Sequence, residues 1–137
     1  MKQGKSWGHT TQVLKTPFCE MHAIEINPWS RCSKHKHQYK SNLFYVTQGE
    51  LLIKVYRDNL VDETLLQAGE WTVVHPNEFH EFQTRSETCV ALEVYYPEGI
   101  ADDIVRLDQG GKVKAPVLET KNFGGYVNLK IGEYQEE

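Results

Sequence analysis

Short segments in which apolar and polar residues alternate recur along most of this chain, and turn-favouring residues separate them. Apolar residues at the helical spacing of three or four positions are scarce. Short strands with turns at this spacing are typical of an antiparallel β-sandwich or barrel, whose interior is filled by alternate residues. The chain is therefore predicted to be all-β. The expected strands are Thr11–Leu14, Cys19–Ile26, Leu43–Thr47, Glu50–Tyr56, Thr64–Leu66, Glu70–His75, His80–Thr84 and Thr88–Tyr96.

A length of 137 residues suits one ordinary domain and is too short for two. We expect the barrel domain to span residues 1–111, because the strand-rich block ends near Pro97–Ile100 and a Gly110-Gly111 pair follows. Residues 112–137 mix Lys, Pro, Gly and Glu. They are expected to form a C-terminal extension, which is an edge strand, a dimer arm or a partly ordered tail.

Charge and composition exclude several classes of partner. The net charge of −4 provides no basic field to hold a nucleic acid or an anionic membrane. No apolar run approaches the roughly 20 residues that a membrane-spanning helix needs, and the N-terminus lacks the apolar core of a signal peptide. Cys19, Cys32 and Cys89 are odd in number and widely spaced, which is typical of free thiols. We therefore expect a cytoplasmic protein that binds neither nucleic acid nor membrane.

Three histidines have the spacing of a metal site. His35 and His37 stand two positions apart, so on a strand their side chains project from the same face. His80, on a later predicted strand, can complete a site between them. Neutral imidazole is the commonest protein ligand for several transition metals. This pattern predicts a metal centre held by His35, His37 and His80.

These histidines also resemble the two sequence motifs of the cupin superfamily. His35, His37 and Gly49 fall on its first motif, and Gly69 and His80 fall on its second. The resemblance covers about residues 20–97. It implies a single-domain double-stranded β-helix, also called a jelly-roll barrel, that binds one divalent metal ion (Zn, Mn, Fe, Co or Ni).

Asn42 stands where the cupin motif has a glutamate, and the resemblance makes it the fourth candidate metal ligand. Its amide oxygen carries no charge, so the site would keep the full charge of the ion and act as a stronger Lewis acid. A neutral oxygen is, however, a poorer ligand for a hard ion than a carboxylate. The alternative for Asn42 is a hydrogen bond to a backbone group at the start of a strand.

The ends of the cupin-like block have a closer resemblance, to the type II mannose-6-phosphate isomerase cupin domain. Residues 5–8 read Lys-Ser-Trp-Gly, which resembles that family's Lys-Pro-Trp-Gly opening, and residues 102–107 read Asp-Asp-Ile-Val-Arg-Leu, which resembles its closing segment. This resemblance implies a metal-dependent sugar-phosphate isomerase or epimerase whose ligand is a small polar molecule. The family has a basic residue after the last histidine, where this chain has Glu81. The candidate replacements are Lys40, Lys54, Arg57 and Arg106.

For an isomerase, a carboxylate or a second histidine near the metal must move a proton between adjacent substrate carbons. The candidate catalytic residues are Glu81 and His75. The candidate substrate-binding residues are Arg106, Lys54 and Tyr95. Gln83 and Glu93 also lie on predicted strands that should pass near the site.

Two other functions suit the same residues. A three-histidine site with open positions can bind O₂ and a substrate, as in a non-haem Fe(II) dioxygenase. The barrel can also be a noncatalytic module that binds a metal and a small sugar. Each of these proteins is expected to work as a homodimer, because small sandwiches often pair through an edge strand.

Overall fold

The computed structural model of the chain describes residues 2–97, 107, 109, 110, 112, 118–123 and 126–131. All the regular elements in these residues are β-strands, which confirms the all-β prediction. No helix in this part of the chain is long and apolar enough to cross a membrane. The strands are β1 (Lys2–Lys5), β2 (Gly8–Lys15), β3 (Glu20–Ile26), β4 (Ser41–Gln48), β5 (Glu50–Arg57), β6 (Leu60–Gln67), β7 (Trp71–Val74), β8 (Phe79–Gln83), β9 (Cys89–Tyr96), β10 (Leu118–Phe123) and β11 (Tyr126–Ile131).

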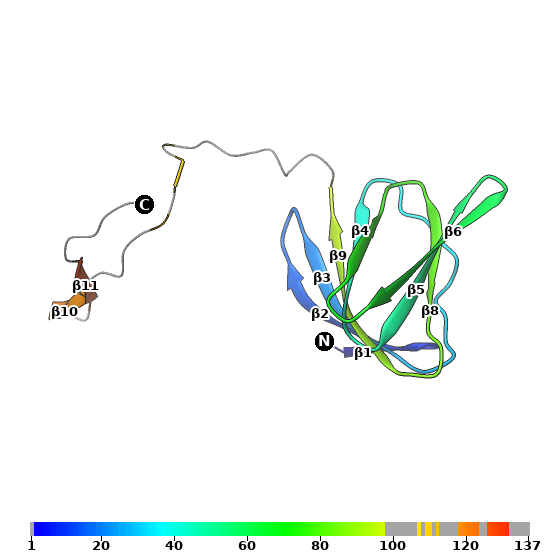
Figure 1. Cartoon of the computed structure of the whole chain (residues 1–137), viewed down its shortest axis with the longest axis horizontal. Coiled ribbons are helices and arrows are strands. Elements are labelled where there is room, and N and C mark those ends of the chain that lie inside the picture. The colour runs from blue at the N-terminus through cyan, green and yellow to red at the C-terminus, as the bar shows by residue number, and fades with distance from the viewer. Residues whose placement is uncertain are drawn as a thin grey trace. The chain divides into compact units, whose positions relative to one another are not determined.

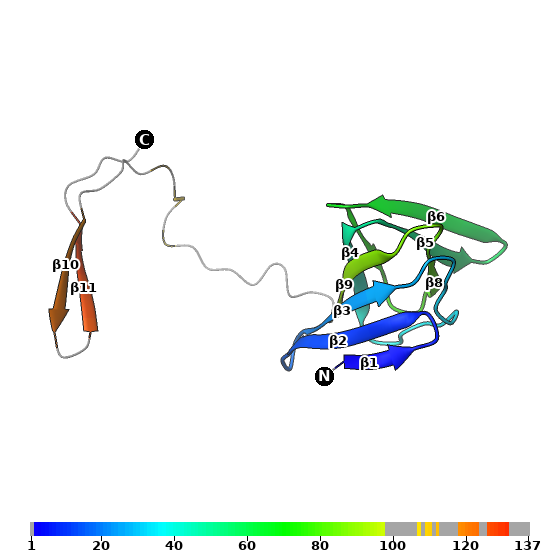
Figure 2. The ribbon, with the colours of Figure 1, turned by 90° about the horizontal axis from the view of Figure 1, so that it is seen from below.

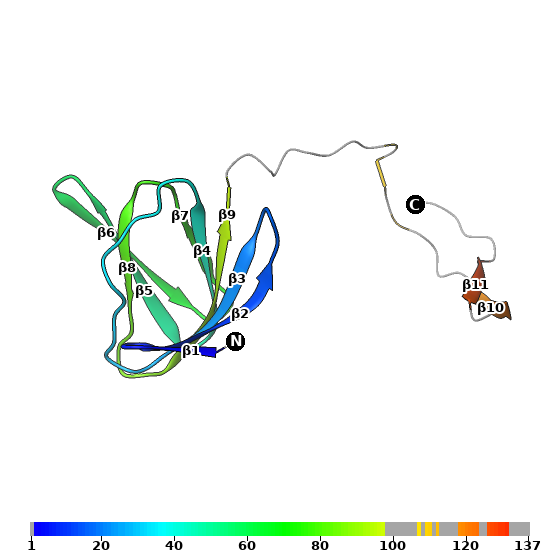
Figure 3. The same ribbon diagram turned by 180° about the vertical axis from the view of Figure 1, so that it is seen from behind.

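The first compact unit, residues 1–102, consists of two facing antiparallel sheets (Figures 1 and 3). The larger sheet has the strand order β1-β2-β3-β9-β4-β7, and the smaller has the order β6-β5-β8. Figure 2 shows β1, β2, β3 and β9 lying one after another across the larger sheet. Because β9 pairs with both β3 and β4, the first and last parts of this unit share one sheet.

A hydrophobic core fills the space between the two sheets. Alternate residues of each strand point inward, as the period-2 pattern requires. On β5, for example, Leu51, Ile53 and Val55 are buried, whereas Leu52 and Lys54 between them are partly exposed. The buried apolar residues are Ile24, Ile26, Cys32, Phe44, Val46, Leu51, Ile53, Val55, Leu66, Val74, Phe82, Cys89 and Ala91.

The eight expected strands all appear, most with ends shifted by one to three residues, and β6 extends four residues further toward the N-terminus than predicted. The strand β1 was not predicted, because Lys2–Lys5 contains no apolar residue; its backbone pairs with β2. The second unit, residues 103–137, contains the antiparallel pair β10 and β11. The predicted division at residue 111 and the role of the extension stay predictions.

Candidate metal centre

The interior of the barrel changes from apolar to polar along its strands. On β9, Ala91 is followed on the same face by Glu93 and Tyr95. On β4, the inward position before Phe44 is Asn42, which is 1% exposed. Because β4 and β9 are neighbours in register, these polar residues lie at one end of the barrel. This end contains the candidate site.

The segment that carries His35 and His37 runs along the free edge of β8 (Figure 3). The backbone amides and carbonyls of His35 and His80 exchange hydrogen bonds of 3.0 and 2.8 Å. Further on, the amide of Asn77 donates to the carbonyl of His37 at 2.7 Å. The expectation that the two histidines share a regular strand is wrong in detail, because the segment pairs with β8 only at isolated bridges. It nevertheless places them beside His80.

The three predicted histidines form one cluster. Ring nitrogens of His35, His37 and His80 all lie within 4.8 Å of one another, so one ion can reach all three. The ring centroids are 4.5 Å apart for His35 and His80, 5.0 Å for His35 and His37, and 5.5 Å for His37 and His80. Three neighbouring imidazoles form a donor set that suits several divalent transition metals.

Hydrogen bonds on the outer side of the cluster orient two of the rings. The Nδ1 atom of His35 lies 2.7 Å from the carbonyl oxygen of Ser33, and that of His80 lies 3.0 Å from the carbonyl oxygen of Glu78. A carbonyl oxygen can only accept, so each Nδ1 carries the hydrogen and each Nε2 keeps its lone pair for a metal. Among the described residues, the buried Nε2 of His37 has no hydrogen-bond partner. This arrangement fits a metal ligated through three Nε2 atoms.

The surroundings also keep two of the imidazoles neutral. Burial, the Lys40 ammonium and the other two histidines together lower the pKa of His37 to about 4. Burial is the main cause that lowers the pKa of His80. Since a metal ligand must be unprotonated, both rings are in the ligating form at neutral pH.

Asn42 and Glu93 lie next to the histidines. The amide Nδ2 of Asn42 is 3.5 Å from Nε2 of His80 and 3.4 Å from a carboxylate oxygen of Glu93. The Oδ1 atom of Asn42 is buried, and the part of the chain that the structure describes supplies no partner for it. The other carboxylate oxygen of Glu93 accepts a 2.6 Å hydrogen bond from the hydroxyl of Tyr95. Position 42, where the cupin motif has a glutamate, is an uncharged Asn in this chain. Glu93 therefore brings a carboxylate close to a site that lacks this glutamate.

A cleft of about 370 Å³ opens beside this cluster. Its walls include His35, Glu93, Tyr95, His22 and Trp7. Tyr95, a predicted substrate-binding residue, thus lies between the cleft and the metal candidates, with its ring 5.3 Å from that of His37. A small polar molecule in this cleft can contact the histidine cluster and the Glu93 carboxylate together.

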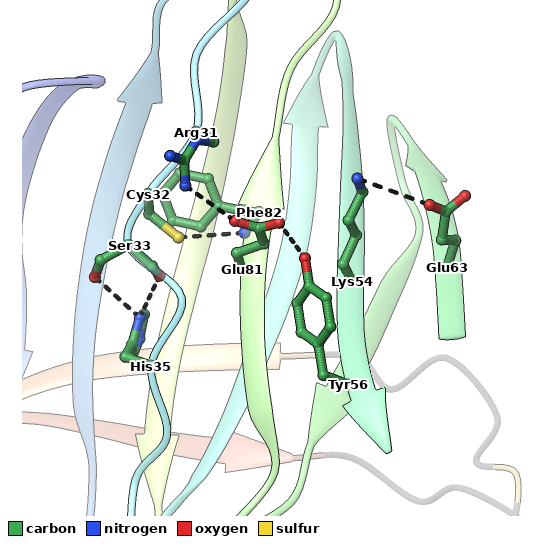
Figure 4. Close-up of polar contacts among 9 residues, drawn as sticks. All are labelled: Arg31, Cys32, Ser33, His35, Lys54, Tyr56, Glu63, Glu81 and Phe82. Carbon is green, nitrogen blue, oxygen red and sulfur yellow. Dashed lines mark hydrogen bonds and ion pairs between the residues drawn. The ribbon is translucent and has the colours of Figure 1, made fainter. Parts of the chain in front are cut away.

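Glu81, a predicted catalytic residue, lies elsewhere. It follows His80 on β8, so its side chain projects from the opposite face of the strand. Figure 4 shows its carboxylate between Arg31 and Tyr56. The hydroxyl of Tyr56 donates a hydrogen bond to it, and a guanidinium nitrogen of Arg31 is 3.4 Å away. The structure does not bring Glu81 together with the histidine cluster, because strand alternation turns neighbouring residues to opposite faces.

The predicted substrate-binding lysine also faces away from the cluster. Lys54 lies opposite Glu81 on β5, and its ammonium is 3.8 Å from the carboxylate of Glu63 (Figure 4). Arg57 is held by two carboxylates at 2.6 Å each. Both cations are therefore engaged in ion pairs outside the candidate site.

The remaining predicted residues are His75 and Arg106. His75 follows β7, is exposed, and is not a member of the histidine cluster. Arg106 lies outside the described residues, so its predicted contact with substrate stays a prediction.

His22 was not predicted and faces the cleft. It pairs in register with Glu93, and its ring is 5.8 Å from that of Tyr95. Its Nδ1 atom is buried and has no hydrogen-bond partner among the described residues. The sequence signal was present: His22, Ile24 and Ile26 alternate on one strand, so His22 continues the inward face of that strand.

Comparison with known proteins identifies this architecture. Residues 23–95 match the family model described as a cupin domain. A search of curated proteins finds no sequence that matches the chain.

Solved structures with the same fold share little sequence with this chain. KdgF from Halomonas sp. is 15% identical, with a TM-score of 0.62 over 72% of this chain and 89% of the other. The Cnp3 cupin domain of Schizosaccharomyces pombe is 10% identical, with a TM-score of 0.62 over 72% and 69%. An oxalate decarboxylase of Lactobacillus farciminis, in a formate complex, is 20% identical, with a TM-score of 0.64 over 71% and 31%. The match to the family model and these folds confirm the jelly-roll barrel expected from the sequence.

Proposed function

Because the chain belongs to the cupin domain family, we propose that it binds one divalent metal ion through Nε2 of His35, His37 and His80. The observation that carries this proposal is the outward hydrogen bonding of His35 and His80 together with the buried, unpartnered Nε2 of His37. These contacts orient the rings in the way that the hydrogen-bond partners of ligating histidines do in metal centres. Asn42 lies beside the cluster and is the candidate for a fourth ligand.

The chemistry that best suits the site is isomerisation or epimerisation of a sugar phosphate. A bound divalent ion would supply a Lewis acid that polarises a carbonyl or hydroxyl oxygen of the substrate. Glu93 is the carboxylate next to the cluster, and it would take a proton from one substrate carbon and return it to the next. The hydroxyl of Tyr95 holds the Glu93 carboxylate in place. In this proposal Glu93 takes the role that the sequence suggested for Glu81.

The placement of the N-terminal segment supports this substrate class. Lys5, Ser6 and Trp7 belong to the segment that resembles the mannose-6-phosphate isomerase family, and all three line the cleft beside the histidines. The stretch that carries the resemblance is therefore close enough to contact a ligand in this cleft.

One observation favours a second function, that of a non-haem Fe(II) dioxygenase. The clustered donors are three imidazoles, with no carboxylate among them. Such a set leaves the charge of the ion uncompensated and its remaining positions free for O₂ and a substrate. A noncatalytic cupin that binds a small polar molecule would use the same site.

Metal analysis tests the ligand assignment. Tag-free protein purified without chelators is expected to retain about one equivalent of transition metal. The His37→Ala variant is expected to lose it, because one of the three ligand nitrogens is removed. His9→Ala is the matched control, since Nε2 of His9 on β2 lies 3.1 Å from the carboxylate of Glu25 on β3 and His9 is not in the cluster. Unchanged metal content in His37→Ala would refute the assignment.

Proton NMR in heavy water tests the activity. Metal-replete protein is expected to exchange the proton beside the carbonyl of fructose 6-phosphate or mannose 6-phosphate, and Glu93→Gln is expected to abolish this exchange while it retains metal. Iron in the purified protein together with O₂ uptake would instead support the dioxygenase. Retained metal without exchange or O₂ uptake would support the binding module.

A further inference from the structure

A second pocket, of about 250 Å³, lies where the turn between β2 and β3 meets the start of β4 and the end of β9. Its walls combine aromatic rings with lysines. The residues that matter here are Lys15, Phe18, Tyr39, Lys40, Tyr95 and Tyr96.

Tyr95 connects this pocket to the histidine cluster. One part of its surface lines the cleft beside His35, and another lines the second pocket. Its ring lies edge-on to the ring of His37, with centroids 5.3 Å apart. The ammonium of Lys40 stands 3.8 Å from the centre of the same ring. A cation and a candidate metal ligand therefore both contact one side chain.

Positive charge outweighs negative charge among the side chains that line this pocket. Within the described part of the chain, neither Lys15 nor Lys40 forms an ion pair with a carboxylate. Glu20 also lines the pocket, but its carboxylate is 3.5 Å from Nε2 of His22.

The aromatic rings at the rim are unusually open to solvent. Phe18 is 67% exposed and Tyr39 is 81% exposed, in the turn after β2 and just before β4. Large exposed rings gathered around a polar pocket are typical of ligand-binding surfaces, because their flat faces can cover the apolar side of a sugar.

We infer that this pocket is an anion subsite, in which Lys40 and Lys15 bind the phosphate or carboxylate at one end of a small ligand whose oxygen atoms reach the histidine cluster. The inference rests on the proposed function and extends it to the charged end of the substrate. It also identifies a replacement for the basic residue missing at position 81. Of the four candidate cations, Lys54 and Arg57 are engaged in ion pairs outside the site, and Arg106 lies outside the described residues. Lys40 alone among the described candidates lines this pocket.

Calorimetric titration of the whole chain tests the subsite, with fructose 6-phosphate, gluconate and uncharged fructose as probes. The two anions are expected to bind more tightly than fructose, and the tighter of them identifies phosphate or carboxylate as the natural group. Lys40→Gln is expected to weaken anion binding roughly tenfold, as the loss of one charged hydrogen bond predicts. Lys15→Gln should have a smaller effect in the same direction. Binding of fructose should not change.

The matched control is Lys36→Gln, because Lys36 is a lysine of the same segment whose ammonium lies over the ring of Phe79, outside this pocket. Equal losses in Lys36→Gln and Lys40→Gln, or no preference of the unmodified protein for anions over fructose, would overturn the inference. Metal content measured on each variant separates the two proposals. Anion binding that depends on Lys40 in protein without metal supports the subsite even where the metal proposal fails.

Discussion

The hydroxyl of Tyr56 on β5 donates a hydrogen bond to the carboxylate of Glu81 on β8, on the face opposite His80 (Figure 4). Arg31 and Lys34, from the segment that carries His35 and His37, contact this Tyr56–Glu81 pair. Arg31 is 3.4 Å from the Glu81 carboxylate, and the Lys34 ammonium is 3.7 Å from the centre of the Tyr56 ring. These contacts hold that segment against β8 beside the histidine cluster.

We predict that Glu81 positions the metal ligands through this arrangement. Glu81→Gln removes the charge that Arg31 contacts, and Tyr56→Phe leaves the buried carboxylate without its hydroxyl donor. Each change should weaken metal affinity about tenfold, which is the lower end of the effects of removing groups that orient metal ligands, while the metal stoichiometry at saturation stays the same. Competition with a chelator measures this affinity.

Lys54→Gln is the matched control for these variants, because Lys54 lies on the same face but pairs with Glu63. A chelator competition curve for Glu81→Gln that overlays those of the control and the unmodified protein would show that Glu81 plays no positioning part.

The two glycines that frame the cupin motifs are predicted to differ in their tolerance of a side chain. Both have positive φ, +78° at Gly49 and +88° at Gly69. A Cβ at Gly49 would lie 2.4 Å from the carbonyl oxygen of Thr88, whereas a Cβ at Gly69 meets nothing within 4 Å. Gly69→Ala should therefore cost only the conformational term, about 1 kcal/mol, and Gly49→Ala roughly 1–3 kcal/mol more. Urea unfolding of the two variants measures the difference, and equal losses would contradict the steric explanation.

The fold could be predicted from the sequence because strand alternation and turn residues are patterns of residues that are neighbours in the chain. The alternation on β3, β5 and β9 corresponds to strands in the structure, whereas β1 has no apolar face to reveal it. The three histidines could also be predicted, since their spacing in the sequence matches the family motifs. Their hydrogen bonds to Ser33 and Glu78 could not be predicted, because these bonds depend on how the segment lies along β8.

The surroundings of the site were predicted less well, and the physical reason is the direction of side chains. Glu81 is adjacent to His80 in sequence, yet strand alternation places it on the other face. Glu93 is distant in sequence, yet it lies 3.4 Å from Asn42, because β4 and β9 pair in the larger sheet. Sequence proximity therefore pointed to a carboxylate on the opposite face of β8, whereas pairing between distant strands places the Glu93 carboxylate beside Asn42 and the histidines.

Thiol reactivity is predicted to depend on burial. Burial raises the pKa of Cys32 to about 11 and that of Cys89 to about 12, so almost no thiolate forms at pH 8. Cys19 is partly exposed. Iodoacetamide at pH 8 should label Cys19 in the folded protein, and Cys32 and Cys89 only after unfolding, as peptide mass spectrometry would show.

The same pKa values carry a stability prediction. A thiol whose folded pKa is raised stabilises the fold fully below its ordinary pKa of 9.0, and this contribution is lost as the pH rises through about 11 to 12. The urea concentration at the midpoint of unfolding should therefore decrease as the pH is raised above 9. Relative to its own value at pH 8, the midpoint of Cys89→Ala should decrease less than that of the unmodified protein. Equal falls in both proteins would contradict the contribution of this thiol.

Replacing Asn42 by Asp tests whether this position faces the metal. The new carboxylate would stand where the amide Nδ2 now lies 3.4 Å from a Glu93 oxygen. A buried carboxylate at position 42 and the partly buried carboxylate of Glu93 would repel each other at this distance, so metal-free Asn42→Asp should be less stable than the unmodified protein by roughly 1–3 kcal/mol. A divalent ion beside both carboxylates should offset this repulsion, because a carboxylate oxygen is a better ligand than an amide oxygen for a hard ion. Saturating Mn²⁺ should therefore stabilise Asn42→Asp more than the unmodified protein.

Thermal unfolding with a chelator and with excess Mn²⁺ measures both effects, since a ligand that binds only the folded state raises stability by an amount that grows with the logarithm of its affinity. The Asn42→Asp, Glu93→Gln double variant is the control. It removes the repulsion, so most of the metal-free loss should disappear while the gain from Mn²⁺ remains. If Asn42→Asp lowers stability equally with and without Mn²⁺, Asn42 does not face the ion, and Glu93 alone supplies the carboxylate near the three histidines.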